Sequence, residues 1–413
     1  MRLKIRFMNY AVILFFWSFV AHASLSTHFK LGIENTEDTI WAFLKGCKTK
    51  PAVGLITNQT GKDQQGMRTI DLLLQRDLYV KRMFAPEHGL HGSTHASHEV
   101  DDVVDAATRI PVISLYGNGT GKKLQAHTIA DLDVLLFDMQ DSGMRHYTYI
   151  STLLHCMKVA AQHDKPFVVL DRPNPLGHRM EGPISPHEST SFIAVAPIPL
   201  RHGMTIGELA RYFNNHRLEK KVKLHVVKLK NFERTMGHPG DLLAPLSPHI
   251  NSKQACFGYS FLGLLGEVRP FDTGLGTDKA MHCLALPEKI AFKTVQWKRL
   301  QALLKMHHLD STIHSYYSPR KKQMCHGLLF QVVDINKTAS FDVVLTILKF
   351  FNDAKIDLAF APIFDTAIGT PKVQEYVKGT ISYASLMASV KSDLMNFHAQ
   401  VQASYLYHPQ PSF

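Results

Sequence analysis

The feature that most constrains this chain is an alternation, from about residue 51 onward, of short apolar runs with segments of helical periodicity. The apolar runs have the length of buried strands, and the segments between them repeat apolar residues at the helical period. The predicted strands cover 52–56, 80–84, 112–115, 134–137 and 167–170, and the predicted helices cover 69–75, 122–130 and 149–162. Such an alternation is typical of a mostly parallel sheet with helices on its faces, so the sequence predicts an α/β fold.

The second half of the chain indicates a further domain. With 413 residues, 45% of them hydrophobic, the chain is long enough for one or two cores. A predicted strand at 222–229 is followed by a polar stretch, 231–248, which has the composition of a domain boundary. Beyond it we predict strands at 327–333 and 357–360 and helices at 340–352 and 383–404. The sequence thus predicts two α/β domains, at about 45–235 and 240–407, of which the second is smaller.

Residues 1–23 have the pattern of a secretory signal peptide. Basic residues near the start precede an apolar run, 11–20, and Ala21-His22-Ala23 has the small-x-small form of a cleavage site. The run is shorter than the ~20 residues that span a bilayer. We therefore predict an exported protein, periplasmic or secreted, with no stable membrane span after the signal is cleaved.

Charge and cysteine usage exclude several classes of protein. The formal net charge of the chain is +11. Its basic residues form no clustered stripe with interleaved aromatic residues, so nucleic acid is not a predicted partner. A positive balance favours an acidic polymer. The five cysteines are an odd number with no CxxC spacing, which indicates neither a disulfide framework nor a thiolate zinc site. The glycine-rich segment 117–123 fits neither nucleotide-binding motif, and no cofactor is predicted.

Several predicted strands end in polar loops. These loops are 57–61, 85–89, 116–119, the segment from 138 onward, and 171–177. In open α/β sheets, ligands bind at the edge formed by the carboxyl ends of the strands. We therefore expect these loops to meet on one rim and to hold the functional site.

The densest polar segment is 138–149. It contains Asp138, Gln140, Asp141, Arg145 and Tyr147 directly after an apolar run. Two carboxylates and a guanidinium suit a polyhydroxylated or anionic substrate, such as a sugar acid. The alternative is a structural loop whose aspartates cap the helix that begins near residue 148.

Glu87 is the candidate general acid. It follows Pro86 in a tight loop at a strand end, where partial burial would keep a carboxyl group protonated. Glycosidic cleavage pairs such an acid with a second carboxylate or with an acetamido group of the substrate. Candidates for the second carboxylate are Asp138, Asp141, Asp171 and Glu181. The alternative is that Glu87 braces its loop by accepting backbone hydrogen bonds.

Four histidines, His88, His91, His95 and His98, raise the alternative of a metal site. Glycines between them prevent a helix that would place the ligands on one face. A solvent-exposed loop rich in histidine is the favoured interpretation, and no metal is predicted.

Taken together, the loop motifs resemble the YbbC-like, NamZ-type family of exo-acting β-N-acetylmuramidases. The motifs that carry the resemblance are Gly54–Gly61, Ala85–Gly89, Ser114–Gly117, Asp138–Tyr149, Asp171–Gly177, Glu181–Pro183, Arg201–Leu209 and the segment Phe364–Tyr407. The family releases N-acetylmuramic acid (MurNAc) from the non-reducing ends of peptidoglycan fragments. The resemblance implies a Rossmann-like N-terminal domain, a smaller C-terminal domain and a cleft between them.

The resemblance also suggests roles for individual residues. Glu87 corresponds to the glutamate proposed as catalytic, and Arg145 becomes a candidate partner for the lactyl carboxylate of muramic acid. The candidate catalytic residues are Glu87, Asp141 and Glu181. The candidate substrate-binding residues are Asn58, His88, Gln140, Arg145, Tyr147, Asp171, Asn174, His202 and Glu267.

The chain departs from the family pattern at three positions. His91 replaces an arginine, His249 replaces the asparagine of Ser-Pro-Asn-Ile, and Leu275 replaces the arginine of Gly-Arg-Gly-Thr. Loss of a guanidinium removes up to five donors, so contacts with the polymer or with the leaving group are expected to differ from the family norm.

The predicted function is therefore an exo-acting glycoside hydrolase. Its expected substrates are peptidoglycan-derived muropeptides or the disaccharide MurNAc-GlcNAc, where GlcNAc is N-acetylglucosamine. One alternative is a protein that binds muropeptides in the same cleft without turnover. A metal-dependent hydrolase built on the histidine loop is a further alternative.

Overall fold

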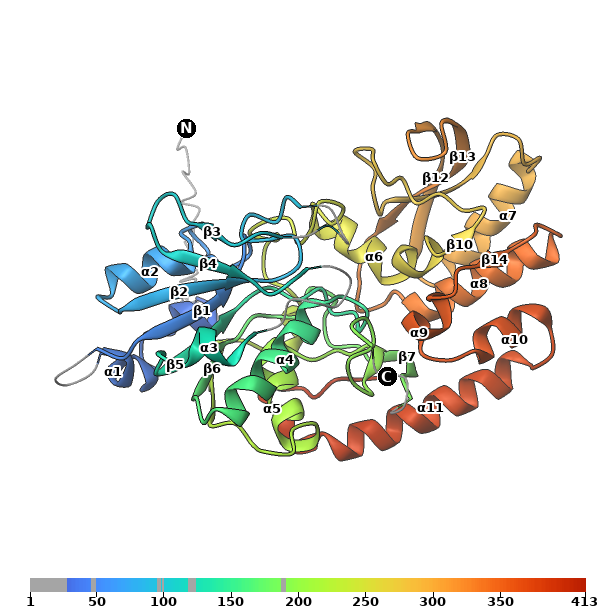
Figure 1. The fold of residues 1–413 in the computed structure, drawn as a ribbon. Coiled ribbons are helices and arrows are strands. Elements are labelled where there is room, and N and C mark those ends of the chain that lie inside the picture. Colours follow the sequence, from blue (N-terminus) through green and yellow to red (C-terminus); the bar gives the residue numbers. More distant parts are fainter. Residues whose placement is uncertain (1–27, 46–49, 95–97, 99, 118–123, 187–190) are drawn as a thin grey trace, which may run out of the picture.

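The predicted strands of the first half form one seven-stranded sheet, in the order β3-β4-β2-β1-β5-β6-β9. Its strands are β1 (Val53–Thr57), β2 (Val80–Ala85), β3 (Val103–Val104), β4 (Pro111–Ser114), β5 (Val134–Asp138), β6 (Phe167–Leu170) and β9 (Leu224–Val227). All neighbours are parallel except β3, which runs antiparallel to β4 at one edge. The predicted α/β fold with a mostly parallel sheet is confirmed (Figure 1).

The computed structural model describes residues 28–45, 50–94, 98, 100–117, 124–186 and 191–413. The predicted signal peptide, His95 and most of the glycine-rich segment 117–123 lie outside the described residues.

Helices cover both faces of the sheet because the strands are apolar on both sides. In β5, Val134 and Leu136 pack with α1 (Ile40–Lys45) and α2 (Thr69–Gln75), whereas Leu135 and Phe137 pack with α4 (Tyr149–Gln162) and α5 (Ile206–His216). The short α3 (Ala126–Ile129) contributes Ile129 to the second of these cores. Alternate side chains of a strand point to opposite faces, which is why each fully buried run supports two helical layers.

A capping box formed by Thr205 and Glu208 begins α5. The Thr205 hydroxyl accepts from the Glu208 N–H at 3.2 Å, and the Glu208 carboxylate accepts from the Thr205 N–H at 3.0 Å. The two bonds satisfy donors that the first helical turn leaves unpaired.

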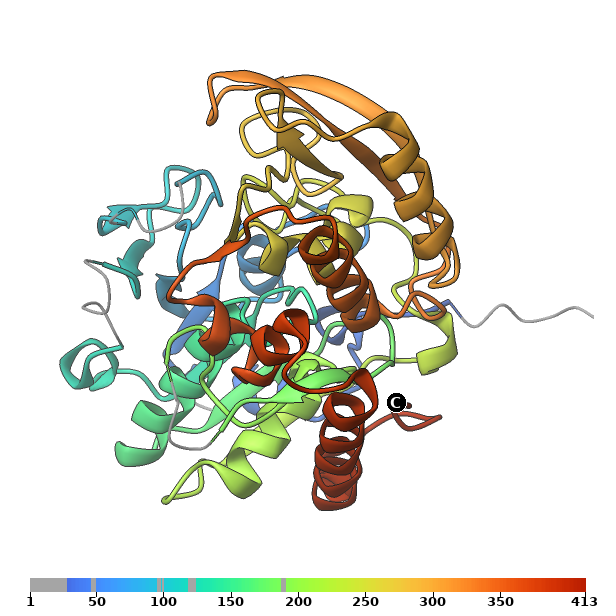
Figure 2. The same ribbon diagram turned by 90° about the vertical axis from the view of Figure 1, so that its right-hand side faces the viewer.

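The second half forms a smaller α/β domain around a three-stranded antiparallel sheet in the order β11-β13-β12. These strands are β11 (Cys283–Pro287), β12 (Leu309–Ser318) and β13 (Gln323–Val332), and a separate pair joins β10 (Val268–Arg269) to β14 (Ala359–Phe360). The helices are α6 (Lys253–Leu265), α7 (Thr294–Lys305), α8 (Ser340–Asp353), α9 (Phe364–Ile368), α10 (Lys372–Lys378) and α11 (Tyr383–Gln400). Figure 2 shows the β12–β13 hairpin curving over this domain.

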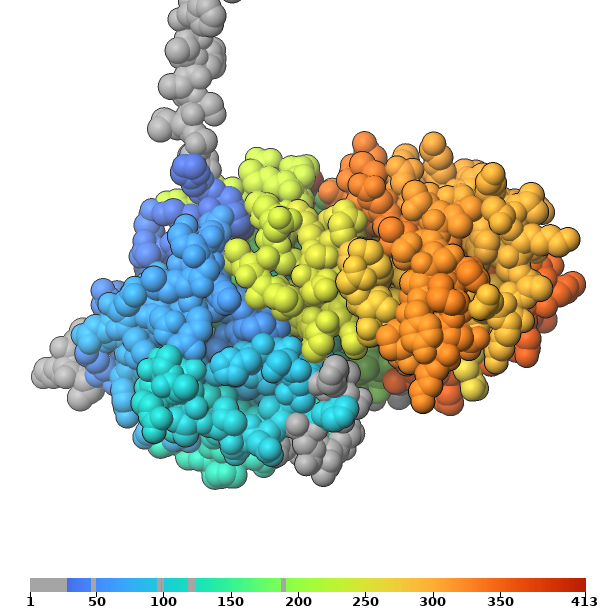
Figure 3. Space-filling model, turned by 90° about the horizontal axis from the view of Figure 1, so that it is seen from above, coloured from blue at the N-terminus to red at the C-terminus, as the bar shows by residue number. Residues whose placement is uncertain are grey.

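The two domains share one core. Buried side chains of α4 and α5 belong to the same apolar cluster as those of α6 and α8. The long α11 runs back toward the first domain, beneath the pair β7 (Glu181–Ile184) and β8 (Pro199–Arg201) (Figure 1). Figure 3 shows the segment around residue 250 lying between the two halves of the molecule. Among the described helices, none combines the length and apolarity required to cross a bilayer.

Candidate active site

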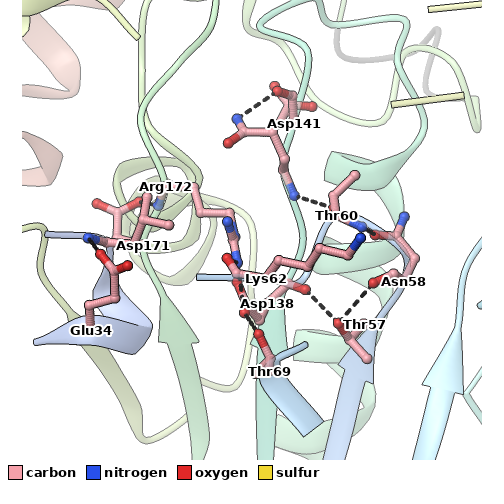
Figure 4. Close-up of polar contacts among 12 residues, drawn as sticks. Glu34, Thr57, Asn58, Thr60, Lys62, Thr69, Asp138, Asp141, Asp171 and Arg172 are labelled. Carbon is pink, nitrogen blue, oxygen red and sulfur yellow. Dashed lines mark hydrogen bonds and ion pairs between the residues drawn. The ribbon is translucent and has the colours of Figure 1, made fainter. Parts of the chain in front are cut away.

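Asp138, at the end of β5, belongs to a buried ionic network (Figure 4). Its carboxylate accepts from Arg172 Nε at 2.5 Å and Nη2 at 2.9 Å, and also from the Thr69 hydroxyl. Arg172 Nη2 donates further to the Lys62 carbonyl at 2.8 Å. Both members of the ion pair are buried, so this network holds strand-exit loops together.

Asp171, at the end of β6, has four donors. The backbone N–H groups of Arg172 and Gly207 donate to Oδ1, and the hydroxyls of Thr205 and Tyr407 donate to Oδ2, all between 2.6 and 2.9 Å. Burial raises the pKa of the Asp171 carboxyl to about 7, although the donors oppose that change. Asp171 therefore joins β6 to α5 and to the C-terminal segment.

A third group of predicted residues forms hydrogen bonds within and between the strand-exit loops. His202 Nε2 donates to Asp141 Oδ2 at 3.1 Å, and Gly143 N–H donates to the same oxygen at 2.7 Å. Gln140 Nε2 donates to the Asp141 and Pro173 carbonyls. The neighbouring amides Asn58 and Asn174 accept from backbone N–H groups of their own loops, Asn58 Oδ1 from Thr60 and Asn174 Oδ1 from Leu176. The loops thus meet on one rim, as expected, but these side chains mainly shape the rim.

Neither Asp138 nor Asp141 caps α4. The residue before that helix is Thr148, which itself makes no side-chain capping bond, and the two carboxylates are bound elsewhere. The capping alternative is therefore wrong.

Arg145 is fully buried and its guanidinium binds main-chain carbonyls. Nη1 donates to Pro183 O at 2.6 Å and Ile198 O at 2.8 Å, and Nη2 donates to Ala367 O at 3.0 Å. Burial lowers its pKa to about 9. Since these carbonyls come from both domains, Arg145 fastens the two domains together, and it is not among the residues that line the cavity between them.

Glu181 is likewise occupied at the join between domains. Its carboxylate pairs with Arg201 and accepts from the Phe341 N–H at 3.0 Å, where α8 begins. It lines a separate cavity of about 190 Å³ between β7 and α11. The structure therefore does not bring Glu181 together with Glu87.

A cavity of about 290 Å³ lies between the two domains. It is lined by Glu87, His88, His146, Tyr147, Thr148, Ile193, Ser247, His249, Ile250, Tyr259, Gly263, Glu267, Met281, Ile363 and Ala367. Four of the predicted site residues meet here: Glu87, His88, Tyr147 and Glu267. We refer to this cavity as the cleft.

Glu87 is held in the cleft wall by the loop after β2. The residue is 8% exposed, and its Oε2 accepts from the Thr148 hydroxyl at 2.6 Å. The next residue, His88, has φ of 71°, a strained value for a residue with a side chain, and its Nδ1 donates to Thr94 O at 2.6 Å. The sharp turn fixes both side chains against the cleft.

Two tyrosines, Tyr147 and Tyr259, line the cleft, and the ring of Tyr149 packs against that of Tyr147. The hydroxyls of Tyr147 and Tyr149 donate to one carbonyl, Leu246 O, at 2.7 and 3.0 Å, which holds the interdomain segment in place. Burial, followed by the charge of Glu87, raises the pKa of Tyr259 on α6 well above its usual range. Tyr259 therefore remains protonated and able to donate.

Sequence reasoning missed His146, Thr148, Tyr259 and Gly263 as cleft residues. The first two lie inside the motif 138–149, so their position was a usable signal, whereas Tyr259 and Gly263 occupy a mostly apolar helix that carries no polar motif. Of the departures from the family pattern, His249 lines the cleft, and Leu275 instead packs partly buried against the core. Within the described part of the chain, no group of three or more His, Cys, Asp or Glu side chains could hold a metal ion.

The fold and the cleft define a two-domain α/β protein in which a carboxyl group on a sheet-edge loop faces a cavity between the domains. Comparison with known proteins identifies the family. The chain belongs to the NamZ family of exo-β-N-acetylmuramidases, which are glycoside hydrolases. Residues 53–254 match the N-terminal domain of that family and residues 257–407 match its C-terminal domain.

Individual relatives agree with this assignment. The chain is 32% identical over 369 residues to the peptidoglycan β-N-acetylmuramidase NamZ of Bacillus subtilis, covering 86% of each protein. It is also similar to two DUF1343 family proteins of known crystal structure from Bacteroides fragilis. One has a TM-score of 0.79 at 30% identity and the other 0.72 at 25% identity, each over 92% of this chain and 99% of the other.

Proposed function

We propose that the protein is an exo-acting glycoside hydrolase that releases terminal β-linked MurNAc from peptidoglycan fragments, with Glu87 as its general acid and base. The observation that carries the proposal is the position of Glu87, a nearly buried carboxyl group in the wall of the interdomain cleft. Membership of the NamZ family supports the choice of substrate.

The proposed reaction begins with proton transfer from Glu87 to the glycosidic oxygen as the bond from that oxygen to the anomeric carbon breaks. The Thr148 hydroxyl donates to Oε2 at 2.6 Å, which fixes the carboxyl group in one orientation. After the alcohol leaves, the Glu87 carboxylate takes a proton from the attacking water. General acid–base catalysis of this kind contributes about 10²- to 10⁴-fold in rate.

The second group in the reaction is either a carboxylate or the acetamido group of the substrate. Among the described lining residues, Glu267 is the other carboxylate, and it comes from the wall formed by the C-terminal domain. It replaces Asp141 and Glu181 in this proposal, because their carboxylates are bound to His202 and Arg201 outside the cleft lining.

We also propose that the mature protein acts outside the cytoplasm. The sequence of residues 1–23 supports export, and the net positive charge suits an acidic cell-wall polymer. Measuring the mass of the protein recovered from culture would test this, since cleavage after Ala23 gives a chain that begins at Ser24.

Mass spectrometry of the products from MurNAc-GlcNAc tests the proposed activity. We expect free MurNAc from the wild type and from an EDTA-treated sample, and at least a hundredfold slower release from Glu87→Gln. Glu219→Gln, at an exposed position after α5, is the matched control and should behave as wild type.

Each other outcome has a definite meaning. Intact disaccharide with measurable heat of binding would replace the proposal with a muropeptide-binding protein. Loss of activity with EDTA would favour the metal-dependent alternative. Wild-type rates from Glu87→Gln would remove the catalytic role of Glu87.

A further inference from the structure

His146 is a polar residue in the cleft with unmet hydrogen-bonding capacity. It lies in the loop between β5 and α4 and lines the cavity beside Tyr147 and Thr148. Both ring nitrogens are buried, and neither has a hydrogen-bond partner among the described residues. Buried polar atoms are almost always paired in native proteins, so an imidazole that lacks both partners requires an explanation.

The surrounding structure makes room for this ring. It lies 4.9 Å from the ring of Tyr259, measured between centroids. Gly263, one turn further along α6, also lines the cleft, and a Cβ atom there would lie 3.1 Å from His146 Nε2 and 2.9 Å from Tyr259 Cε2. Glycine inside a helix is unfavourable relative to alanine. The chain thus contains two costly residues, an unpaired imidazole and a helical glycine, that fit each other at the cleft.

His146 is uncharged over the physiological range. Burial, followed by the nearby charge of Arg145, lowers its pKa to about 3. A neutral imidazole presents one N–H donor and one nitrogen acceptor. Such a group suits an uncharged polar partner better than a carboxylate.

The rest of the lining indicates which uncharged group this is. The cleft that His146 lines also presents apolar side chains, among them Ile193, Ile250, Met281 and Ile363. An amide that carries a methyl group matches both parts of this surface, because the amide can bond to the imidazole while the methyl group contacts apolar atoms.

We propose that His146 determines substrate specificity by turning its ring within the cleft as the sugar binds, so that one ring nitrogen forms a hydrogen bond to the acetamido group. This inference rests on the proposed function, since it concerns the same cleft and the same substrate. It assigns the unpaired ring nitrogens of His146 a partner that only a bound substrate supplies.

His146→Phe provides the test because phenylalanine keeps the ring and its contact with Tyr259 but removes both nitrogens. On an aryl β-MurNAc substrate we expect kcat/KM to fall about 10- to 100-fold, as for loss of a buried hydrogen bond to a substrate. The melting temperature should stay equal or rise, because the free protein loses two unpaired polar atoms. A structural histidine would give the opposite result, lower stability with unchanged kcat/KM.

A second substrate identifies the group that His146 binds. In an analogue whose acetamido group is replaced by a hydroxyl, the fall in kcat/KM should be about 10- to 100-fold larger for the wild type than for His146→Phe, because the variant has already lost its contact with that group. An equal further fall in both proteins would overturn the assignment to the acetamido group. His216→Phe is the matched control, since His216 also stacks on a tyrosine, Tyr212, but lies on α5 and not in the cleft lining.

The two proposals can fail separately. A wild-type protein that is inactive on the aryl β-MurNAc substrate rejects the proposed function, and the inference with it. If the wild type is active and a folded His146→Phe has the same kcat/KM, only the inference about His146 is rejected. If His146→Phe does not fold, His146→Leu replaces it, with the same expected fall in kcat/KM and the same overturning result.

Discussion

Two groups of polar side chains lie near the carboxyl edge of the same sheet, and they differ in how completely they are paired. The Asp138–Arg172–Asp171 network binds each carboxylate with several donors, as Asp171 shows with four. In the cleft, by contrast, His146 has two buried nitrogens without a described partner. A high density of polar residues therefore marks the architecture of the rim, whereas unmet hydrogen-bonding capacity at a cavity marks the site.

The largest effect should come from breaking the buried network. Arg172→Met leaves the Asp138 carboxylate buried without its ion pair, and removing one partner of such a pair costs about 3–5 kcal/mol. Urea titration would measure this loss, while kcat/KM of the folded fraction should remain within about threefold of wild type, because Arg172 does not line the cleft. Lys220→Met, which removes an exposed pair with Asp164, is the control and should cost below about 1 kcal/mol. A large catalytic defect of Arg172→Met with unchanged stability would mean that the buried network, and not the cleft, serves the reaction.

Substitution of Thr148 should have a smaller effect, and that effect should fall on activity instead of on stability. Thr148→Val removes the hydroxyl that fixes the orientation of the Glu87 carboxyl group, and misplacing a catalytic group can cost about 10²-fold in rate. We expect kcat/KM to fall about 10- to 100-fold, with a smaller change in stability than that of Arg172→Met. Thr152→Val, one turn further along α4, should leave kcat/KM unchanged, since its hydroxyl contacts only the Thr148 carbonyl at 3.4 Å. Equal activities of the two variants would show that the Thr148 hydroxyl does not support Glu87.

His146 should also make stability depend on pH. Its native pKa is about 3 and its ordinary value is 6.5, so between these values the unfolded chain binds a proton that the native protein does not. Stability is therefore complete above about pH 6.5 and declines as the pH falls, by about 2 kcal/mol between pH 7 and pH 5. The groups around His146 are Arg145 on its own loop, Tyr259 on α6, and the cleft carboxylates Glu87 and Glu267.

Denaturant titrations of the wild type and His146→Phe at several pH values would isolate this contribution. The stability difference between the two proteins should widen in favour of the variant as the pH falls. Parallel stability curves of the two proteins from pH 8 to pH 5 would mean that His146 binds its proton as readily in the native cleft as in the unfolded chain.

The smallest effect is expected at Leu275. This residue packs partly buried against the core and does not line the cleft, so Leu275→Arg should change kcat/KM on the disaccharide by no more than roughly threefold. Comparing short and long peptidoglycan fragments would show whether the guanidinium adds contacts with the polymer. Leu275→Met controls for packing. A change above tenfold on the disaccharide would place this loop in the sugar site.

The sequence predicted the elements whose pattern is local. The bounds of α2 and α4 match their predicted ranges, 69–75 and 149–162, because helical periodicity and flanking polar loops define both ends. The strand β12 was missed because it lies at a sheet edge and alternates exposed and buried residues without an apolar run. Pairing with β13 gives it its structure, and that partner is a tertiary feature.

The site was predicted less completely than the fold for a related reason. Glu87 and Arg145 have equally suggestive surroundings in the sequence, yet one faces the cleft and the other binds three carbonyls at the join between domains. Residue type and spacing indicate which chemistry is available. They do not show which polar atoms the folded chain will use for its own construction, and that decides which remain for a substrate.

The fit between His146 and Gly263 restricts the order in which this cleft can change by mutation. Because a Cβ atom at position 263 would come within 3.1 Å of the imidazole and within 2.9 Å of the Tyr259 ring, alanine or any larger residue at that position crowds both rings. Both neighbouring rings would have to change first, and the imidazole would be lost before the helix regained a better helix former. Replacing the glycine alone is therefore a disfavoured first step, so drift toward a more stable helix passes through a protein that has already given up these two rings.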